Sequence, residues 1–441
     1  MNVPDSDSED ELPPGWEERV TVDGNVFYAN HLTKATQWTH PRTGIKKVVN
    51  GELPFGWERC VDKNTGKVIY VDHENKRTTY TDPRLAFAIE EKDHVNDYRQ
   101  RFDASSTALQ VLHGRDLNNK LCVITGGNCG IGLETAKSLC RHGCHVIIAC
   151  RNMEAGQMAL EDIRGCKPDA KCDVVQLDLA SLTSVSNCGE EIHRRLLPTN
   201  RSIDMLILNA GVFGLPFEKS DDGYEKTFAV NHLGHFYLTL LLKPLLKVGS
   251  RVVVLSSESH RFANLTADTL NPSTLSVESS QYWHMTAYNN SKLCNVLFAR
   301  QLAKNLQDKG ISVFSLHPGN MVSSGLARNW WLYRIAFFLV RPFTKSMQQA
   351  ASTTVFCATA VELQGTTGVY FNNCYRCQES QSGQSDVMAV KLWKISCKMI
   401  EDSLGDRAKG LDNIELINEK IADCQDQGHN QGQSHREREI C

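Results

Sequence analysis

The sequence predicts a multidomain protein in which two small three-stranded antiparallel β-sheets precede an α/β domain with a doubly wound parallel sheet. Residues 12–41 and 53–83 are two copies of one short pattern, with turn residues between β-rich runs. From about residue 118, apolar runs of strand length alternate with segments of helix length. That alternation is typical of a parallel sheet covered by helices on both faces.

Composition narrows the class of protein. The chain has 441 residues, 48 basic and 51 acidic side chains and a net charge of -3, which excludes the broad basic surface of a dedicated nucleic-acid binder. Its 16 cysteines are too sparse for a small secreted disulfide scaffold and suit a reducing cytosol. The acidic run at residues 5–11 argues against a signal peptide. The apolar run at 330–340 has about half the roughly 20 residues of a membrane span.

Shifts in composition divide the chain into seven segments. We expect a disordered acidic leader (1–11), a first repeat module (12–45), a second module (53–86), a polar linker (87–117), the α/β domain (118–385), a C-terminal helix (386–405) and a disordered polar tail (406–441). Between the modules, Lys46 and Lys47 are read as part of a solvated linker, with a nuclear signal as the alternative. The expected compartments are the cytoplasm and the nucleus, and association with mitochondria or a membrane surface stays open.

Each repeat keeps an LPxGW opening, a central aromatic strand, a His, a Thr and a closing Pro, and therefore resembles a WW domain. In a sheet of about 30 residues with little core, Trp16 is expected to pack on Pro41, and the second module repeats this contact between Trp57 and Pro83.

The resemblance also implies a groove that binds polyproline II segments. In the first module we expect Tyr28 and Trp38 to form its aromatic walls. His31, with Thr36 beside it, would accept the tyrosine of a PPxY-type ligand. Tyr80 stands in the second module where the first has Trp38, so the second groove is either weaker or only a brace for the first module.

The first strand of the α/β domain, LCVIT at residues 121–125, runs into TGGNCGIG and then into a helical segment at 133–142. A glycine loop at this junction suits a pyrophosphate, because the backbone can approach it and the helix N-terminus offers unpaired N–H groups. The spacing TGxxxGxG resembles the short-chain dehydrogenase/reductase superfamily, which implies a Rossmann-type fold and a nicotinamide cofactor.

Arg151 follows the second strand, at the position where an NAD-preferring site carries an acidic residue. A guanidinium suits a 2′-phosphate, with assistance from Asn152, so the sequence predicts NADP (NADPH); surface solvation of Arg151 is the alternative. The cofactor-binding residues implied by the resemblance are Thr125, Gly126, Asn128, Gly130, Ile131, Gly132, Arg151, Asp178, Asn209, Ala210, Gly211, Tyr288, Lys292, Pro318 and Gly319.

The predicted catalytic set centres on Tyr288 and Lys292, which share one face of a helix at i and i+4. A tyrosine with an ordinary pKa of about 10 needs nearby positive charge to exchange a proton at neutral pH, and Lys292 with the oxidised nicotinamide supplies it. By resemblance, Ser257, rather than Ser256, orients the substrate oxygen. Asn231 would distort its helix and hold a relay water. Ser323 or Ser324 stands near the superfamily's usual Thr beside the nicotinamide.

The aromatic segment at residues 329–343 lies where this superfamily varies its substrate lid. It favours a lipophilic substrate such as a steroid or retinoid, and a helix that packs on another subunit or a membrane surface is an equal alternative. Cys374 and Cys377 form a CYRC pair without a second ligand pair, so we expect packing and no metal site.

Two hypotheses of different classes follow. The first is an NADP-dependent oxidoreductase, acting on a carbonyl or alcohol, whose first WW module recruits it to proline-rich PPxY proteins. The second is an adaptor whose dehydrogenase fold senses cofactor with little turnover. The resemblance implies a role in signalling, transcription-factor regulation and apoptosis. It also implies a homodimer through the helices that carry Asn231 and Tyr288, and no direct contact with nucleic acid.

Overall fold

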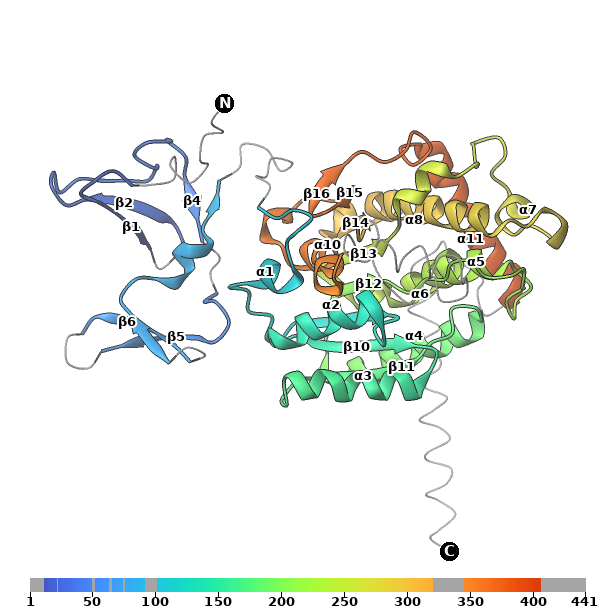
Figure 1. Ribbon diagram of the computed structural model, residues 1–441, viewed down its shortest axis with the longest axis horizontal. Helices are drawn as coiled ribbons and strands as arrows, with labels where there is room; N and C mark the ends of the chain where they lie inside the picture. Colours follow the sequence, from blue (N-terminus) through green and yellow to red (C-terminus); the bar gives the residue numbers. More distant parts are fainter. Residues whose placement is uncertain are drawn as a thin grey trace, which may run out of the picture.

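The computed structural model describes residues 12–21, 23–49, 52–62, 66–73, 76–91, 101–319 and 345–405. Small β-sheets from the N-terminal part of the chain lie beside a larger α/β domain (Figure 1). The predicted fold class is confirmed, because both repeats form three-stranded antiparallel sheets and the large sheet is mainly parallel. The first small sheet contains β1 (Trp16–Val20), β2 (Val26–Asn30) and β3 (Thr36–Gln37); the second contains β5 (Trp57–Val61), β6 (Val68–Asp72) and β7 (Arg77–Thr79).

A third small sheet joins the segments that follow the two modules. It pairs β4 (Lys47–Val48) with β8 (Ile89–Glu90), and β8 comes after the 3₁₀ turn η1 (Pro83–Phe87). Leu85, Ala88 and Val49 pack in one cluster with residues of β2. The chain that follows the second module therefore completes the core of the first, which neither module has enough apolar residues to build alone.

The large sheet has eight strands in the order β11-β10-β9-β12-β13-β14-β15-β16. All neighbouring strands are parallel except β15 and β16 at the edge. The chain therefore starts in the sheet at β9, winds outward through β10 and β11, and then crosses to β12 on the other side of β9. The strands are β9 (Leu121–Thr125), β10 (His145–Cys150), β11 (Cys172–Gln176), β12 (Ile203–Leu208), β13 (Leu246–Leu255), β14 (Ser312–His317), β15 (Val369–Asn372) and β16 (Tyr375–Cys377).

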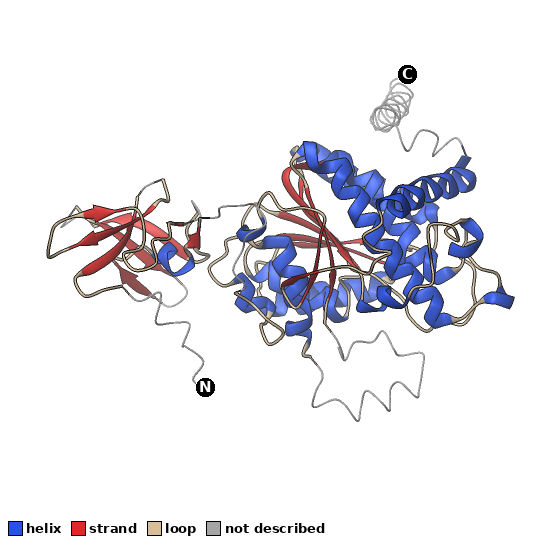
Figure 2. Cartoon of the chain, turned by 90° about the horizontal axis from the view of Figure 1, so that it is seen from above, coloured by secondary structure: helices blue, strands red, loops and turns tan. Residues whose placement is uncertain are grey.

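Helices cover both faces of this sheet (Figure 2), and a separate apolar core lies on each face. One face is covered by α4 (Leu182–Leu196), α6 (Gly234–Leu242), α8 (His284–Leu306) and α11 (Asp386–Leu404). The other is covered by α1 (Ala108–Leu112), α2 (Gly130–Arg141), α3 (Met153–Cys166) and α10 (Met347–Thr359). Across the described ranges, no helix combines the length and hydropathy needed to span a membrane.

Short helices and turns complete the described elements. The short α-helices are α5 (Lys226–Phe228) and α7 (Pro272–Leu275), and a π-helical turn (Ala229–Leu233) joins α5 to α6. The remaining 3₁₀ turns are η2 (Leu197–Thr199), η4 (Lys243–Leu245), η5 (Glu258–Phe262), η6 (Ser279–Gln281), η7 (Gln307–Lys309) and η10 (Val361–Leu363).

The polar linker expected at residues 87–117 is wrong in its second half. Helix α1 begins after a capping box formed by Thr107 and Gln110. Its side chains Ala108, Val111 and Leu112 are buried in the core that α2 and α10 share. The i, i+3, i+4 spacing of these three residues is the signal of an amphipathic helical turn, but one turn is too short to stand out in a polar segment.

The homodimer face expected on the helices of Asn231 and Tyr288 is occupied within the chain. Helix α11 packs against α8, and the Trp393 ring centroid lies 4.8 Å from that of Phe236 on α6. Tyr224 Oη also donates to the Met399 carbonyl of α11 at 2.6 Å. A second copy could therefore use this face only where α11 leaves it uncovered.

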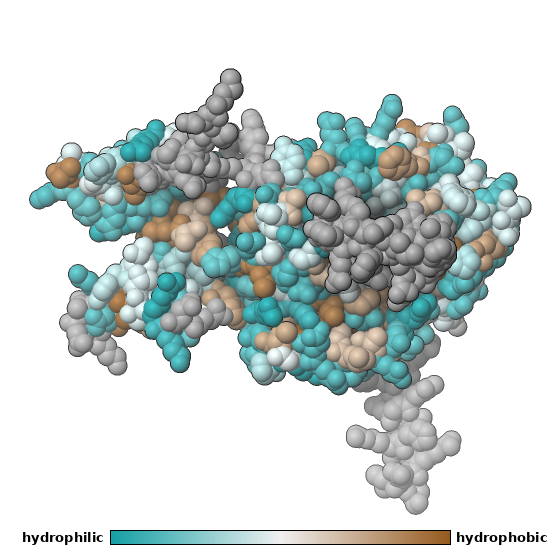
Figure 3. Space-filling model, viewed as in Figure 1, coloured by the Kyte–Doolittle hydropathy of each residue, from teal (hydrophilic) through white to brown (hydrophobic). Residues whose placement is uncertain are grey.

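Two phenylalanines connect the second module and its flanking turn to the large domain. The Phe55 ring lies 5.9 Å from the His142 ring, and Lys167 Nζ lies 5.3 Å from the Phe55 centroid. Phe87 packs 5.3 Å from the His113 ring, in a space that a side chain on Gly114 would fill. Figure 3 shows hydrophobic surface where the small sheets face the large domain, in keeping with these contacts.

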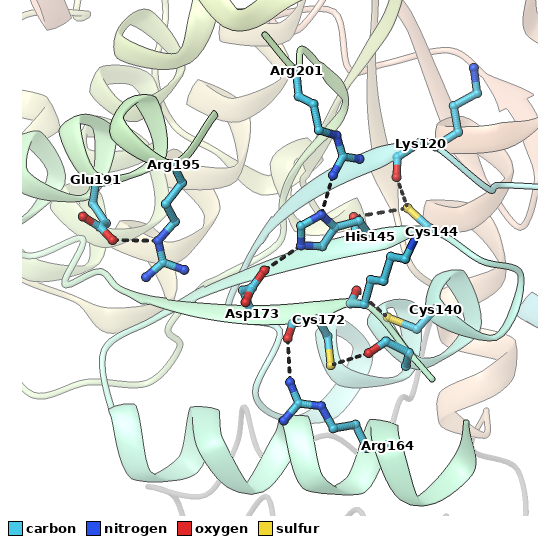
Figure 4. Close-up of polar contacts among 12 residues, drawn as sticks. Lys120, Cys140, Cys144, His145, Arg164, Cys172, Asp173, Glu191, Arg195 and Arg201 are labelled. Carbon is cyan, nitrogen blue, oxygen red and sulfur yellow. Dashed lines mark hydrogen bonds and ion pairs between the residues drawn. The ribbon is translucent and has the colours of Figure 1, made fainter. Parts of the chain in front are cut away.

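A polar network holds the amino ends of the outer strands together (Figure 4). His145 bridges Asp173 at 2.6 Å and Arg201 at 2.7 Å. In the same region the Cys144 thiol donates to the Lys120 carbonyl at 3.6 Å. These contacts are structural, because they lie at the end of the sheet opposite to the carboxyl ends of the strands, where ligands bind in this class of fold.

Replacing Leu112 tests whether α1 belongs to the folded domain. Leu112→Ala removes a fully buried side chain, so we expect the free energy of unfolding to fall by about 2–4 kcal/mol in urea titrations. Met158→Ala shortens a side chain that is 68% exposed and is the matched control, with little change expected. If the two variants are equally stable, α1 is part of the linker and not of the folded domain.

Candidate functional site

A cleft of about 680 Å³ opens at the carboxyl ends of the central strands, a volume within the range of small-molecule and cofactor sites. The order of strands reverses between β9 and β12, and ligands bind at such a switch point in open α/β sheets. Most of the predicted cofactor residues line this cleft: Gly126, Asn128, Gly130, Ile131, Gly132, Arg151, Asp178, Asn209, Ala210, Gly211, Tyr288, Lys292 and Pro318.

The glycine loop has the geometry of a phosphate cradle. Gly126 and Gly130 have φ angles of 64° and 58°, which favour glycine over other residues. A Cβ on Gly132 would lie 2.4 Å from both the Gly126 carbonyl oxygen and Asn209 Nδ2. Helix α2 begins at Gly130, three residues before the predicted start, so its first N–H groups face the cleft. These residues fit the pyrophosphate of a dinucleotide.

Hydrogen bonds between Asn209 and Thr125 hold the glycine loop in place. Asn209 Nδ2 donates to the Thr125 carbonyl at 2.9 Å and to the Gly126 carbonyl at 3.3 Å. The backbone N–H groups of Asn209 and Ala210 donate to Thr125 Oγ1 at 2.9 and 3.0 Å. Thr125 is fully buried and does not line the cleft, so its role is to hold the loop rather than to contact a ligand.

At the far end of the cleft, Arg151 is an exposed cation on the rim. Within the described part of the chain its guanidinium has no hydrogen-bond or ion-pair partner. Asn152 caps helix α3, because its side-chain oxygen accepts from Ala155 N at 3.0 Å. Asp178 accepts from Ala180 N at 2.9 Å and thereby shapes the turn after β11.

Tyr288 lines the cleft and is hydrogen-bonded to Ser257, which lies behind the lining residues. Burial raises the pKa of Tyr288 to about 12, and a hydrogen bond with Ser257 acts in the opposite direction. Ser256 also lines the cleft, but its hydroxyl donates to the Lys292 carbonyl at 2.7 Å. Of the two serines, Ser257 is therefore the one hydrogen-bonded to the tyrosine.

Lys292 is buried one helical turn from Tyr288. Burial lowers its pKa to about 8. Its Nζ donates to the Leu255 carbonyl at 3.2 Å and lies 5.5 Å from the centre of the Tyr288 ring. The lysine thus brings a positive charge close to the tyrosine, while the pKa of the tyrosine in the protein alone stays above its ordinary value.

Asn231 lies in the π-helical turn, so the helix is distorted where the resemblance implied. Its side chain accepts from Val212 N at 2.8 Å and donates to the Val212 carbonyl and to Ser291 Oγ, both at 3.0 Å. The amide group therefore joins the loop after β12 to helix α8. These bonds use both amide hydrogens of the side chain, so its NH₂ group has no hydrogen left for another partner.

Two site residues were missed from the sequence. The Phe213 ring packs edge-on against Tyr288 with centroids 4.8 Å apart, and Phe213 lines the cleft. Ser291 accepts from Asn231 and donates to the Tyr288 carbonyl at 2.7 Å. The position of Phe213, two residues after Asn-Ala-Gly, gives a faint signal, but Ser291 shows its role only once two helices are packed together.

The remaining predicted positions lie in the loop after β14, in the segment that follows it, and in the CYRC pair. Gly319 has a φ of 108°, a conformation that favours glycine, at the start of the loop after β14. Ser323, Ser324 and the aromatic segment 329–343 lie outside the described residues. Cys374 is buried and its thiol lies 3.6 Å from Ser352 Oγ. In the described ranges, no three His, Cys, Asp or Glu side chains are grouped so as to hold a metal ion.

The prediction that Tyr28 forms the peptide groove is wrong. Tyr28 is fully buried, and its hydroxyl donates to Glu18 at 3.1 Å. Side chains alternate along β2, so its neighbour Phe27 faces the other way and contacts Trp38, with centroids 6.0 Å apart. Trp38 is 56% exposed. Phe27 and Trp38 therefore form the aromatic surface, and the alternation along FYAN was the signal that could have found it.

His31 and Thr36 are both exposed, as a ligand-binding role requires. His31 Nε2 lies 2.6 Å from a Glu17 carboxylate oxygen. An ionised carboxylate can accept hydrogen bonds but cannot donate them. Nε2 therefore donates to Glu17, and only Nδ1 of the ring remains to accept from a ligand hydroxyl.

The second module repeats this arrangement with smaller side chains. Tyr70 is buried like Tyr28 and donates to Asp82 at 2.8 Å. Ile69 takes the position of Phe27, and Tyr80, 63% exposed, takes that of Trp38. The second module therefore offers one aromatic wall where the first offers two.

Comparisons with known proteins agree with both parts of the chain. Residues 120–266 match the short chain dehydrogenase family model, and residues 12–41 and 53–83 match the WW domain model. The chain is 55% identical over 403 residues to the WW domain-containing oxidoreductase of Drosophila melanogaster, covering 91% of this chain and 98% of that protein. It is 40% identical over 283 residues to retinol dehydrogenase 12 of Mus musculus, covering 64% and 86%. A crystal structure of an uncharacterized protein from Mycobacterium paratuberculosis is similar with a TM-score of 0.52 and 26% identity, covering 68% of this chain and 97% of that one.

Lys292→Met tests the cost of the buried charge. The folded protein releases this lysine's proton near pH 8, whereas the unfolded chain holds it to about pH 10.4, so this group adds stability to the wild type as the pH rises between those values. We expect the cofactor-free variant to be more stable than wild type near pH 7 by about 1–3 kcal/mol. The difference should shrink as the pH approaches 10, in urea unfolding curves.

The matched control is Lys394→Met, which removes an exposed lysine from α11. Its stability should follow that of the wild type at every pH. A Lys292→Met variant that is less stable than wild type near pH 7 would contradict the prediction.

Proposed function

The chain belongs to the family of WW domain-containing oxidoreductases, and we propose that it exchanges hydride between NADP(H) and the carbonyl or alcohol carbon of a lipophilic substrate. The observation that carries the proposal is that Tyr288 and Lys292 line the same cleft as the glycine cradle, with Ser257 hydrogen-bonded to Tyr288. Bound NADP(H) would supply the hydride acceptor or donor. The chain's own residues supply orientation and the proton.

The proton step is assigned to Tyr288 Oη. Because burial holds the pKa of Tyr288 at about 12, the neutral phenol predominates near pH 7 and is suited to donate its proton to a carbonyl oxygen during reduction. Ser257 can donate a hydrogen bond to the same oxygen as negative charge develops on it. The Lys292 ammonium stabilises the phenolate that remains.

The preference for NADP rests on Arg151. An unpartnered guanidinium among the described residues, on the rim of the cleft at the end of β10, suits the 2′-phosphate of the adenosine ribose. Gly126, Gly130 and Gly132 would take the pyrophosphate, and Asp178 lies near the expected adenine.

A lipophilic substrate is supported by the ring of Phe213 beside the reacting hydroxyl. The similarity to retinol dehydrogenase 12 supports a retinoid-like molecule within this class. Aromatic lining with a few convergent polar groups is the usual composition of sites for such ligands.

The first WW module would deliver this activity to proline-rich PPxY proteins. Phe27 and Trp38 form the exposed aromatic surface that a polyproline II segment requires, with His31 and Thr36 beside it. Recruitment of this kind fits a role in signalling, transcription-factor regulation and apoptosis, in the cytoplasm and nucleus.

Cofactor choice and chemistry are tested together. We expect the wild type to bind NADPH more tightly than NADH and to reduce retinoid or steroid carbonyls. Arg151→Ala should weaken NADPH binding by roughly tenfold or more with little effect on NADH, since a charge-assisted bond is lost. Binding is measured by nucleotide fluorescence and turnover by absorbance.

Tyr288→Phe is the control for chemistry, because it removes the proton donor and keeps the ring beside Phe213. It should abolish turnover and keep NADPH binding. Tight NADPH binding without turnover of any substrate in the wild type would favour the adaptor hypothesis instead.

Peptide binding is tested by titrating a PPxY peptide into the full chain. Phe27→Ala and Trp38→Ala should each weaken binding by roughly tenfold or more, because each removes one wall of the groove. The matched variants Ile69→Ala and Tyr80→Ala alter the second module and should change the affinity little. The first module is not the binder if the Trp38 variant keeps wild-type affinity in calorimetry.

A further inference from the structure

A buried histidine, His235, lies between the cofactor loop and the catalytic helix. It is 1% exposed and sits on α6, one turn after Asn231. Its Nε2 lies 2.8 Å from Thr125 Oγ1 at the end of β9, and its Nδ1 lies 3.2 Å from the Asn231 carbonyl oxygen. Both ring nitrogens are therefore used, each on a different element of the site.

The hydrogen bonds around Thr125 fix which nitrogen carries the proton. Thr125 Oγ1 already accepts from the N–H groups of Asn209 and Ala210. A hydroxyl has two lone pairs and one hydrogen, so its hydrogen is directed to His235 Nε2. Nε2 is thus the acceptor and Nδ1 carries the hydrogen, which it donates to the Asn231 carbonyl.

The neutral form that this pattern requires is also the one that burial favours. Burial, together with the positive charge of Lys292, lowers the pKa of His235 to about 4. Another buried histidine, His232, lies in the π-helical turn before α6 and is likewise held neutral, with a pKa lowered to about 3 by burial. His235 is therefore a fixed donor and acceptor across the physiological range of pH.

The contacts continue from Asn231 through a different group of the same residue, its side-chain amide. Asn231 Nδ2 donates to Ser291 Oγ at 3.0 Å, and Ser291 in turn donates to the Tyr288 carbonyl at 2.7 Å. Two sets of hydrogen bonds, joined covalently at residue 231, thus form a path from the backbone N–H groups of the loop after β12, through Thr125, His235, Asn231 and Ser291, to the backbone of Tyr288.

We propose that His235 is a positioning residue that sets Tyr288 in register with the cofactor loop. The inference rests on the proposed oxidoreductase function. His235 does not line the cleft. Its effect comes from joining the end of β9 to the π-helical turn, because a displacement of about 1 Å between cofactor and proton donor is enough to slow a reaction by roughly a hundredfold.

The central experiment compares His235→Phe with His232→Phe in the full chain. The first keeps a ring of similar shape and removes both bonds of the path, so we expect kcat to fall by roughly tenfold to a hundredfold while KM for the carbonyl substrate changes little. His232 bonds to Ser396 at 3.0 Å, outside the path, and its replacement should leave kcat close to wild type. If the two variants lose kcat equally, His235 only packs in the core and does not position Tyr288.

A double-mutant cycle guards against a variant that fails to fold. Thr125→Val and Ser291→Ala cut the same path at its two ends, and each should lower kcat. Because one cut already breaks the path, the double variant should lose much less than the product of the two single effects. Fully multiplicative losses would overturn the inference.

The protonation of the ring gives a readout that does not depend on turnover. Nitrogen-15 spectra of the wild-type protein with NADPH should show a protonated Nδ1 and an unprotonated Nε2 for His235. The opposite tautomer would overturn the inference even in an active enzyme. Absence of turnover in wild type would overturn the proposed function and leave this spectrum as the test of the path.

Discussion

The close approach of helix α2 to the ends of β9 and β12 is the contact on which the site depends. At Gly132 there is no room for a Cβ beside the Gly126 carbonyl and the Asn209 amide. The same Asn209 amide closes the glycine loop from the other side. The helix N-terminus, the loop and the strand ends are therefore fixed as one unit, and every other site residue takes its position relative to this unit.

Burial shifts the pKa values of Tyr288 and Lys292 and also lowers the stability of the folded protein. Lys292 and Tyr288 both lie away from water, which disfavours the charged form of each, and the two pKa values move in opposite directions. A charged lysine held there reduces stability near neutral pH, and in the proposed reaction it supplies the positive charge beside the phenol. Sites that carry out chemistry commonly give up stability in this way.

The two WW modules are unequal parts of one N-terminal structure. The first has the aromatic pair Phe27 and Trp38 on its exposed face, whereas the second offers Ile69 and Tyr80. The segment after the second module supplies Leu85 and Ala88 to the core beneath the first. The second module thus supports the first, and through Phe55 it also contacts the large domain.

The sequence by itself determined the two small antiparallel sheets, the strands at 121–125 and up to Cys150, and most of the predicted site residues that line the cleft. These features leave local signals, such as repeats, glycine spacing and the i, i+4 pair on α8. The tertiary structure alone decided that Tyr28 is buried, that α1 joins the core, that α11 covers α6 and α8, and that Ser291 and His235 join the site. Each of these depends on contacts between residues far apart in the chain. The local patterns, such as the alternation along β2 and the one-turn spacing of α1, separate the faces of an element but do not say which distant partner a face will meet.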